Sequence, residues 1–213
     1  MTEATNTWTG LKGRIGGWLL ASPLRRCADY VLDGDVQGNL RKELALQGSE
    51  QVIELGSGSG YFTLPIARQL DTGRLRCVDL SATMLERLER RLKARGLQDR
   101  TELIEADVGD VPMPDGQADC VFTAGLLHEL PHPERALGEA HRMLRPGGRL
   151  VIADFRYVEF LWRRLRHHHH PDAHGPYTLP KLEDALVGSG FDDPRARRIR
   201  MWLIASATKP SRC

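Results

Sequence analysis

The sequence predicts an α/β fold in which a doubly wound, mostly parallel sheet is covered by helices on both faces. From residue 51 onward, short and nearly continuous apolar runs alternate with amphipathic segments. Strands of a parallel sheet are nearly continuously apolar because helices bury both of their faces. Three alternating glycines, Gly56, Gly58 and Gly60, follow the first apolar run. A glycine turn between a strand and a helix is typical of the edge where such sheets bind ligands.

The expected elements follow this alternation along the chain. Strands are expected at residues 52–55, 75–78, 102–105, 119–124 and 149–154, with a last strand or pair of strands at 199–207. Helices are expected at 61–70, between Ser81 and Gly96, from about 133 to 144, and at 178–187. Ser81 is a good N-cap, and Gly96 is a residue type that commonly ends helices. No internal repeat or low-complexity linker interrupts this region, so residues 49–210 are predicted to form one domain.

Residues 1–48 are predicted to be a helical extension that covers this domain. Apolar residues recur at helical spacing from Leu24 to Leu46, interrupted by glycines. The extension could be purely structural, or it could be a lid that closes over a substrate pocket. A third hypothesis is that Trp18-Leu19-Leu20, flanked by arginines, touches a membrane surface.

Composition and charge narrow the function classes. The chain has 213 residues, a formal net charge of +2, and 30 basic and 28 acidic residues that are interspersed. This balance argues against nucleic-acid binding. The four cysteines, Cys27, Cys77, Cys120 and Cys213, lie far apart without a CxxC pair, which argues against a zinc ribbon or a disulfide framework and for a reducing compartment. No apolar run reaches the roughly 18 residues of a transmembrane helix, and no signal-type core is present. A cytoplasmic location is expected.

The spacing of the glycine turn distinguishes between two kinds of cofactor. The dinucleotide fingerprint needs glycine or alanine three positions after its second glycine, and the bulky Tyr61 occupies that position. The run Glu54-x-Gly56-x-Gly58-x-Gly60 instead resembles the first motif of the class I S-adenosylmethionine-dependent methyltransferases. Later stretches resemble the type 11, ubiquinone/menaquinone-like branch in order and spacing, namely Asp79, EADV, DCVFTAGLLHELPHP, LRPGGRLVIADF, GSGF and WLIASATKP. The resemblance covers residues 51–210.

The resemblance implies a Rossmann-like, seven-stranded sheet whose last strand is antiparallel, with S-adenosylmethionine as cofactor and S-adenosylhomocysteine as product. By this resemblance, Glu54 helps to hold the methionyl amino group, Asp79 binds both ribose hydroxyls, and Asp107 contacts the adenine amino group beside the backbone N–H of Val108. A carboxylate suits a vicinal diol because it offers two acceptor oxygens. Each acid could alternatively be a turn or strand-end residue. The implied cofactor-binding residues are Glu54, Gly56, Ser57, Gly58, Gly60, Asp79, Leu80, Asp107, Val108, Thr123 and Ala124. One departure from the family is that residues 195–207 show no turn between the sixth and seventh strands.

Methyl transfer needs few catalytic groups. The main task is to align a nucleophile with the activated methyl group, and a general base is needed only if the nucleophile arrives protonated. His128 is the candidate base, because it follows the fourth strand at the ligand-binding edge and imidazole titrates near neutrality. A structural role for His128 is the alternative. Tyr30 and Tyr157 could line the acceptor site or simply pack.

The four histidines His167 to His170, with His174 nearby, invite a metal hypothesis. Adjacent residues on a helix point in different directions, so at most two of the four could converge on one ion. We therefore expect a solvated basic loop and no metal site. The preceding arginines, Arg163, Arg164 and Arg166, could favour an anionic acceptor.

Together these features predict methyl transfer from S-adenosylmethionine to a small-molecule acceptor that is quinone-like, a lipid or another small metabolite. The alternatives are a thiol or metalloid acceptor, a non-catalytic S-adenosylmethionine binder, and a remote NAD(P)-dependent oxidoreductase. No nucleic-acid partner is expected, and a homodimer is compatible with the sequence.

Overall fold

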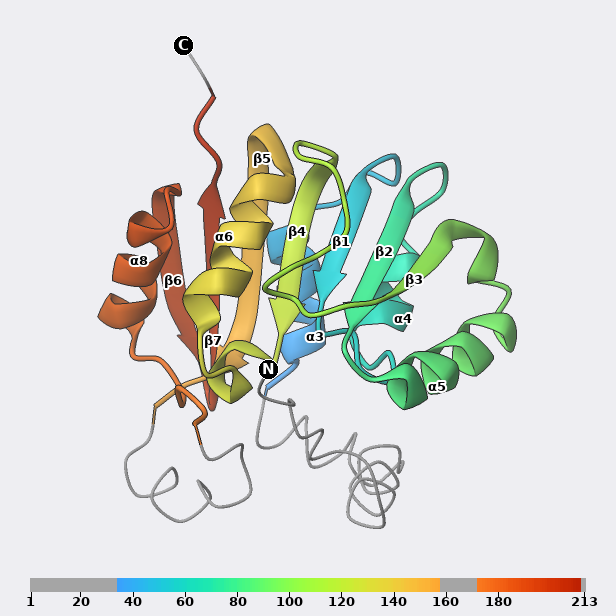
Figure 1. Cartoon of the computed structure of the whole chain (residues 1–213), viewed down its shortest axis with the longest axis horizontal. Helices are drawn as coiled ribbons and strands as arrows, with labels where there is room; N and C mark the ends of the chain where they lie inside the picture. The colour runs from blue at the N-terminus through green and yellow to red at the C-terminus, as the bar shows by residue number, and fades with distance from the viewer. Residues whose placement is uncertain (1–33, 158–171, 212–213) are drawn as a thin grey trace.

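A seven-stranded sheet forms the centre of the computed structural model, which describes residues 34–157 and 172–211 (Figure 1). The strand order is β3-β2-β1-β4-β5-β7-β6. Strands β1 to β5 pair in parallel, and β7 is antiparallel to both β5 and β6. The strands are β1 Gln51–Leu55, β2 Arg74–Asp79, β3 Thr101–Glu105, β4 Ala118–Ala124, β5 Leu144–Phe155, β6 Asp192–Ile199 and β7 Trp202–Thr208. The predicted doubly wound, seven-stranded α/β fold is confirmed.

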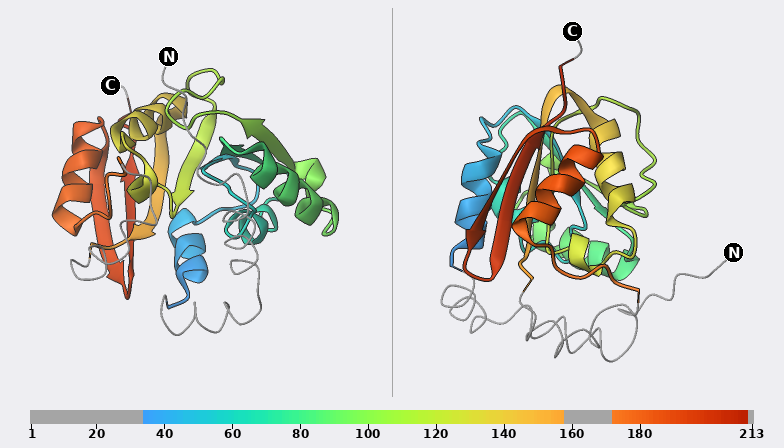
Figure 2. Two further views of the ribbon diagram at one scale, coloured as in Figure 1. Left: turned by 60° about the horizontal axis from the view of Figure 1, so that its bottom comes forward. Right: turned by 90° about the vertical axis from the view of Figure 1, so that its left-hand side faces the viewer.

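Helices cover both faces of this sheet, as the edge-on view in Figure 2 shows. One face carries α3 Val36–Leu44, α4 Thr63–Ala67 and α5 Ala82–Lys93, and the other carries α6 Pro133–Met143 and α8 Leu179–Gly188. Two short 3-10 turns, η1 Gln98–Arg100 and η2 Leu127–Glu129, connect the elements. Within the described residues, none of the helices has the length and apolar character needed to cross a membrane.

Alternating residues of the strands build two separate cores. In β4, Cys120 and Phe122 pack with the α3, α4 and α5 side, whereas Val121 packs with the α6 and α8 side. Successive side chains of a strand point to opposite faces, so each apolar strand supplies both cores. Cys77 and Cys120 are buried free thiols in this arrangement, as expected of small apolar residues.

Three predictions differ from the observed bounds, namely those for α4, for β5 and for the last pair of strands, whose first member β6 runs from Asp192 to Ile199 and so lies before most of the predicted range 199–207. Helix α4 is shorter than the predicted helix at 61–70, because the glycine turn continues through Phe62 and Gly60 has a φ of 90°. Strand β5 begins earlier than predicted, since Leu144 already pairs with Ala118 before the register shifts past the glycines. The turn between β6 and β7 lies at Arg200 and Met201. Arg200 has a φ of 49°, a conformation that normally favours glycine, so the sequence carried no turn signal.

Helix α3 packs onto the sheet within the same core as α4 and α5. Asp35 caps it by accepting a 3.0 Å hydrogen bond from the Gly38 N–H, and Leu40 and Leu44 are fully buried. Helix α3 contacts β5 and β7. The part of the predicted extension before residue 34, including Trp18, lies outside the described residues. The predicted division at residue 48 and the moving lid therefore stay predictions.

Candidate functional site

The glycine turn lies at the edge of the sheet where the parallel strands β1, β2 and β4 end. The N–H groups of Gly56 and Ser57 donate to the Val78 carbonyl oxygen at 2.8 and 3.0 Å, and the Gly60 N–H donates to the Ser57 carbonyl oxygen at 3.0 Å. These bonds fold the turn over the end of the neighbouring strand β2. Sequence reasoning placed the turn here, at the edge where folds of this kind bind ligands.

The three glycines of the turn meet different surroundings. A Cβ atom at Gly60 would lie 2.5 Å from Leu88 of α5, and one at Gly56 would lie 2.9 Å from Leu126. A Cβ atom at Gly58, whose φ is 51°, would meet nothing within 4 Å. Gly56 and Gly60 therefore permit close packing inside the protein, whereas Gly58 leaves an open approach to the backbone.

Asp79 ends β2 directly beside Gly58. Its Oδ2 accepts a 2.7 Å hydrogen bond from the Gly58 N–H, and its Oδ1 accepts a 2.9 Å bond from the Ser81 N–H. Burial raises the pKa of Asp79, although these two hydrogen bonds oppose the shift. Each carboxylate oxygen can accept a second hydrogen bond, so a vicinal diol could still bind here. The next residue, Leu80, exposes 54% of its surface beside this acid.

Glu54 lies beneath the turn and is only 2% exposed. Burial raises the pKa of Glu54 to about 8, even though the Thr63 hydroxyl donates a 2.5 Å hydrogen bond to Oε2, and the nearby Asp79 charge adds to the rise. Glu54 is therefore mostly protonated at neutral pH. A cation placed nearby would favour its ionised form, which agrees with the expected neighbourhood of a methionyl ammonium group.

Two buried hydroxyl groups near the turn have no hydrogen-bond partner among the residues that the structure describes. They are Ser57 Oγ, directly after the first glycine, and Thr123 Oγ1, near the end of β4. Buried polar groups are normally hydrogen-bonded, so these two atoms indicate a place for a polar ligand. Ala124 follows Thr123 as the last residue of β4.

Asp107 and Val108 follow β3 as predicted. Asp107 Oδ1 accepts a 2.8 Å hydrogen bond from the Gly109 N–H, and Oδ2 lies 3.7 Å from Arg135 Nη1. The Asp107 side chain is half exposed, whereas Val108 is buried in the core under α6. Asp107 therefore stabilises its own turn, and its half-exposed carboxylate can still accept a hydrogen bond from a ligand at the surface.

His128 lies in a buried cluster on the other half of the sheet edge. Its Nδ1 lies 2.6 Å from Asp154 Oδ1, its backbone N–H donates to Asp154 Oδ2 at 3.1 Å, and its Nε2 lies 3.3 Å from Glu129 Oε1. Burial lowers the pKa of His128, but the Asp154 and Glu129 carboxylates outweigh it and raise the pKa to about 10. An imidazolium with a carboxylate at each nitrogen is poorly suited to accept a proton. The geometry favours the structural alternative for His128, and the general-base role stays untested.

Three aromatic rings pack close to this cluster. The Phe155 ring centroid lies 4.3 Å from that of Trp202 and 5.1 Å from that of His128, and Phe62 lies 5.9 Å from Trp202. These rings come from the end of β5, the start of β7 and the turn before α4. The buried Trp202 Nε1 has no hydrogen-bond partner among the described residues, and the far edge of its ring lies under Gly125.

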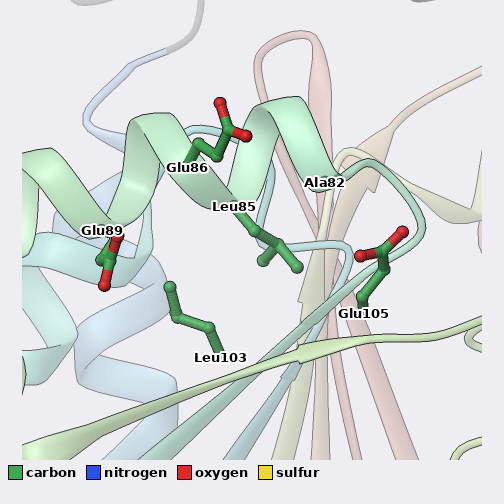
Figure 3. A pocket seen from close by; sticks show the side chains of 6 residues that line it. All are labelled: Ala82, Leu85, Glu86, Glu89, Leu103 and Glu105. Carbon is green, nitrogen blue, oxygen red and sulfur yellow. The ribbon is translucent and has the colours of Figure 1, made fainter.

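A surface depression adjoins the ends of β2 and β3, because its lining residue Glu105 pairs with Asp79 and its lining residue Ala82 follows the N-cap Ser81. Its volume is about 290 Å³, and Figure 3 shows it between α5 and the edge strand β3. It contains none of the predicted site residues. Its lining residues are Ala82, Leu85, Glu86, Glu89, Leu103 and Glu105.

Several predicted features lie outside the described residues, namely Tyr30, Arg163, Arg164, Arg166 and the His167 to His170 tract. Tyr157 is described and partly exposed. In residues 34–157 and 172–211, no cluster of histidine, cysteine or acidic side chains could hold a metal ion. Sequence reasoning missed Leu126, Thr63 and Asp154. Of these, only Asp154 carried a signal, because it is an acid near the end of a central strand, as Asp79 is.

Comparisons with known proteins agree with this fold. Residues 53–152 match the family described as "Methyltransferase domain". The chain is 28% identical over 144 residues to the ubiquinone/menaquinone biosynthesis C-methyltransferase UbiE of Enterobacter sp. (strain 638), covering 66% of this chain and 55% of that protein. The chain therefore spans little more than half the length of this curated relative.

Solved structures share the fold at low sequence identity. A SAM dependent methyltransferase from Aquifex aeolicus superimposes with a TM-score of 0.71 at 20% identity, covering 90% of this chain and 95% of that one. The cyclase SpnF superimposes with a TM-score of 0.72 at 19% identity, covering 83% and 80% of the two chains. These likenesses concern the fold alone.

The fold is that of class I methyltransferase domains. Residues 53–152 match a methyltransferase domain, and the chain is similar to the S-adenosylmethionine-dependent methyltransferases of the type 11, UbiE-like branch. S-adenosylmethionine is the cofactor of this family. The open backbone at Gly58, the Asp79 carboxylate, the exposed Leu80 and the unpartnered Ser57 and Thr123 hydroxyls fit it.

Proposed function

We propose that this protein transfers the methyl group of S-adenosylmethionine to a small-molecule acceptor. The observation that carries the proposal is the contact between Asp79 and the Gly58 N–H, in which a strand-end carboxylate lies against open backbone. In this proposal, Asp79 accepts hydrogen bonds from the two ribose hydroxyls, Leu80 packs against the adenine, and Asp107 accepts from the adenine amino group. Gly56, Gly60 and Val108 shape the site, while Gly58 and Ala124 border the ligand.

The chain contributes mainly by positioning the reactants. Holding an acceptor nucleophile in line with the methyl group can supply on the order of 7–11 kcal/mol of the barrier without a covalent intermediate. Glu54 would ionise beside the methionyl ammonium group, and Ser57 and Thr123 would hydrogen-bond the polar parts of the cofactor. Among the described residues the proposal needs no general base, so it suits an acceptor that reaches the site already ionised.

A quinone-like acceptor is the preferred class. The aromatic rings Phe62, Phe155 and Trp202 at the acceptor side favour a planar ring, and the unpartnered Trp202 Nε1 could donate to an acceptor oxygen. The curated relative is named as a quinone-biosynthesis C-methyltransferase. A lipid or another small metabolite remains within the proposal.

A thiol or metalloid acceptor is less well supported. Metalloid chemistry needs accessible thiolates, and both described cysteines are buried, which raises the pKa of Cys77 and raises that of Cys120 to about 12. An NAD(P)-dependent reaction is opposed by Tyr61 at the third fingerprint position. A non-catalytic binder is the second candidate, because both His128 ring nitrogens are engaged by carboxylates.

The test uses the full chain with methyl-labelled S-adenosylmethionine and a panel of reduced quinones, lipids and thiols. We expect labelled product with a reduced quinone or a related ring acceptor, and tight binding of S-adenosylhomocysteine by calorimetry. Binding without transfer to any acceptor would indicate the non-catalytic binder. No binding of S-adenosylhomocysteine, together with binding of NADH, would overturn the proposal.

A further inference from the structure

The outer side of the glycine turn is held by two side chains that the motif does not contain. Most amide groups of the turn bond inward, to β2, to Asp79 or within the turn itself. Two of its carbonyl groups, at Ser59 and Tyr61, instead accept hydrogen bonds from side chains of two different helices. The turn is therefore held from both flanks as well as from beneath.

Arg91 of α5 supplies one of these bonds. Its Nη1 donates to the Ser59 carbonyl oxygen at 2.6 Å, across 32 positions of the chain. The same helix presses Leu88 against Gly60, and its N-cap Ser81 donates its backbone N–H to Asp79. Helix α5 thus joins the ribose-binding carboxylate to the far side of the turn.

Gln37 of α3 supplies the second bond. Its Nε2 donates to the Tyr61 carbonyl oxygen at 2.8 Å. Helix α3 is itself fixed to the sheet, because Leu40 is fully buried and Glu43 Oε1 accepts a 2.6 Å hydrogen bond from the Ser206 hydroxyl. Gln37 therefore reaches the turn from a rigid support, and the helix before the first strand has a direct contact with the cofactor turn.

We propose that Arg91 and Gln37 are positioning residues that hold the glycine turn in its cofactor-binding conformation. A turn with several positive-φ residues has many alternative conformations, and fixing it before the ligand arrives reduces the entropy lost on binding. Because Arg91 is charged, its hydrogen bond is the stronger of the two. This inference rests on the proposed function, since it concerns the same cofactor site.

The test measures S-adenosylhomocysteine affinity by calorimetry for the wild-type chain and for Arg91→Met, Arg91→Lys and Gln37→Met. Arg91→Met should raise Kd about tenfold and Gln37→Met about threefold, in line with the usual strengths of charged and neutral hydrogen bonds. Arg91→Lys should recover roughly half of the loss on a logarithmic scale, because it keeps a charged donor. Arg90→Met is the matched control, since Arg90 is an exposed neighbour on the same helix, and its Kd should stay unchanged.

All affinities are measured well below the melting temperature of each variant. A purely stabilising role would lower Tm and leave Kd unchanged, and that result would overturn the inference. Equal losses in Arg91→Met and Arg90→Met would overturn it too, because they would reflect the charge of the helix. If Arg91→Met does not fold, Arg91→Lys and Gln37→Met decide the question. Absent binding by the wild-type chain would instead refute the proposed function, so the two failures are distinguishable.

Discussion

The two halves of the strand edge are built in different ways. The proposed cofactor half, which consists of residues 54–60 with Asp79 and Leu80, uses the backbone groups of one glycine motif and carboxyl groups at the ends of two adjacent strands. The proposed acceptor half, which consists of His128, Asp154, Phe155 and Trp202, uses side chains from three separate segments. The comparison teaches that a site made of local backbone geometry can be recognised from a motif, whereas a site made of converging side chains needs the fold.

The halves also differ in their electrostatics. In the cofactor half, burial raises the pKa of Glu54 to about 8 and raises the pKa of Asp79, so both acids respond to a charge placed beside them. In the acceptor half, His128 forms a buried ion pair with Asp154. The first half is arranged to respond to a ligand, and the second half is already charge-paired within the protein.

Asp154→Ala should produce the largest loss of stability and leave cofactor binding nearly intact. Removing one partner of a buried ion pair typically costs about 3–5 kcal/mol, and Asp154 also bonds the His128 and Phe155 N–H groups. Urea unfolding gives the free energy of unfolding, and calorimetry gives the S-adenosylhomocysteine affinity. Asp184→Ala, at an exposed position on α8, is the control and should be neutral.

The pH dependence provides a second measure of the same pair. Because the folded-state pKa of His128 is raised from 6.5 to about 10, its stabilising contribution is fully present below pH 6.5 and is lost as the pH rises through 10. Asp154→Ala should remove this loss at high pH. If a folded Asp154→Ala protein bound S-adenosylhomocysteine tenfold more weakly than the wild type, the claim that the two halves of the strand edge act independently would be wrong.

Much of the fold could be predicted because its signals are local. The apolar strands of the central sheet and the glycine turn follow from residue types within each segment, and the antiparallel last strand came from the family resemblance. The β6–β7 turn could not be predicted, since Arg200 adopts a positive φ without a glycine or asparagine. The His128–Asp154 pair joins residues 26 positions apart, and only the pairing of β4 with β5 brings them together.

Gly60→Ala and Gly58→Ala should separate packing from ligand access within the cofactor half. A Cβ atom at Gly60 adds a clash with Leu88 to the backbone strain, so we expect a loss of about 2–4 kcal/mol in the free energy of unfolding. At Gly58 only the strain remains, about 1–2 kcal/mol, but the new methyl group would project into the open approach. Gly58→Ala should therefore weaken S-adenosylhomocysteine binding more than it weakens the fold. Unfolding curves give the loss of stability, and calorimetry gives the loss of affinity. If Gly58→Ala lost more stability than Gly60→Ala and Gly60→Ala lost more affinity, the assignment of packing to Gly60 and of ligand access to Gly58 would be refuted.

The smallest expected effect concerns the proton on Glu54. The folded-state pKa of about 8 lies above the ordinary value of 4.5, so the stability that Glu54 contributes is present below 4.5 and is lost as the pH rises through 8. A cationic cofactor favours the ionised acid, so S-adenosylmethionine affinity should rise over the same range. In the Glu54→Gln variant, S-adenosylmethionine affinity should depend less on pH. If the pH dependence of the affinity were unchanged, a group other than Glu54 would be titrating.

The affinity of an Asp79→Ala variant for S-adenosylhomocysteine tests the central claim most directly. Loss of two charge-assisted hydrogen bonds to the ribose should weaken binding by roughly 100-fold, while the exposed control Asp71→Ala keeps the wild-type affinity. Asp79→Asn preserves the shape of the side chain, so its affinity for S-adenosylhomocysteine should lie between those of Asp79→Ala and the wild type. A folded Asp79→Ala protein that binds within threefold of the wild-type affinity would show that the ligand does not lie over the glycine turn, and the proposed function would fall with it.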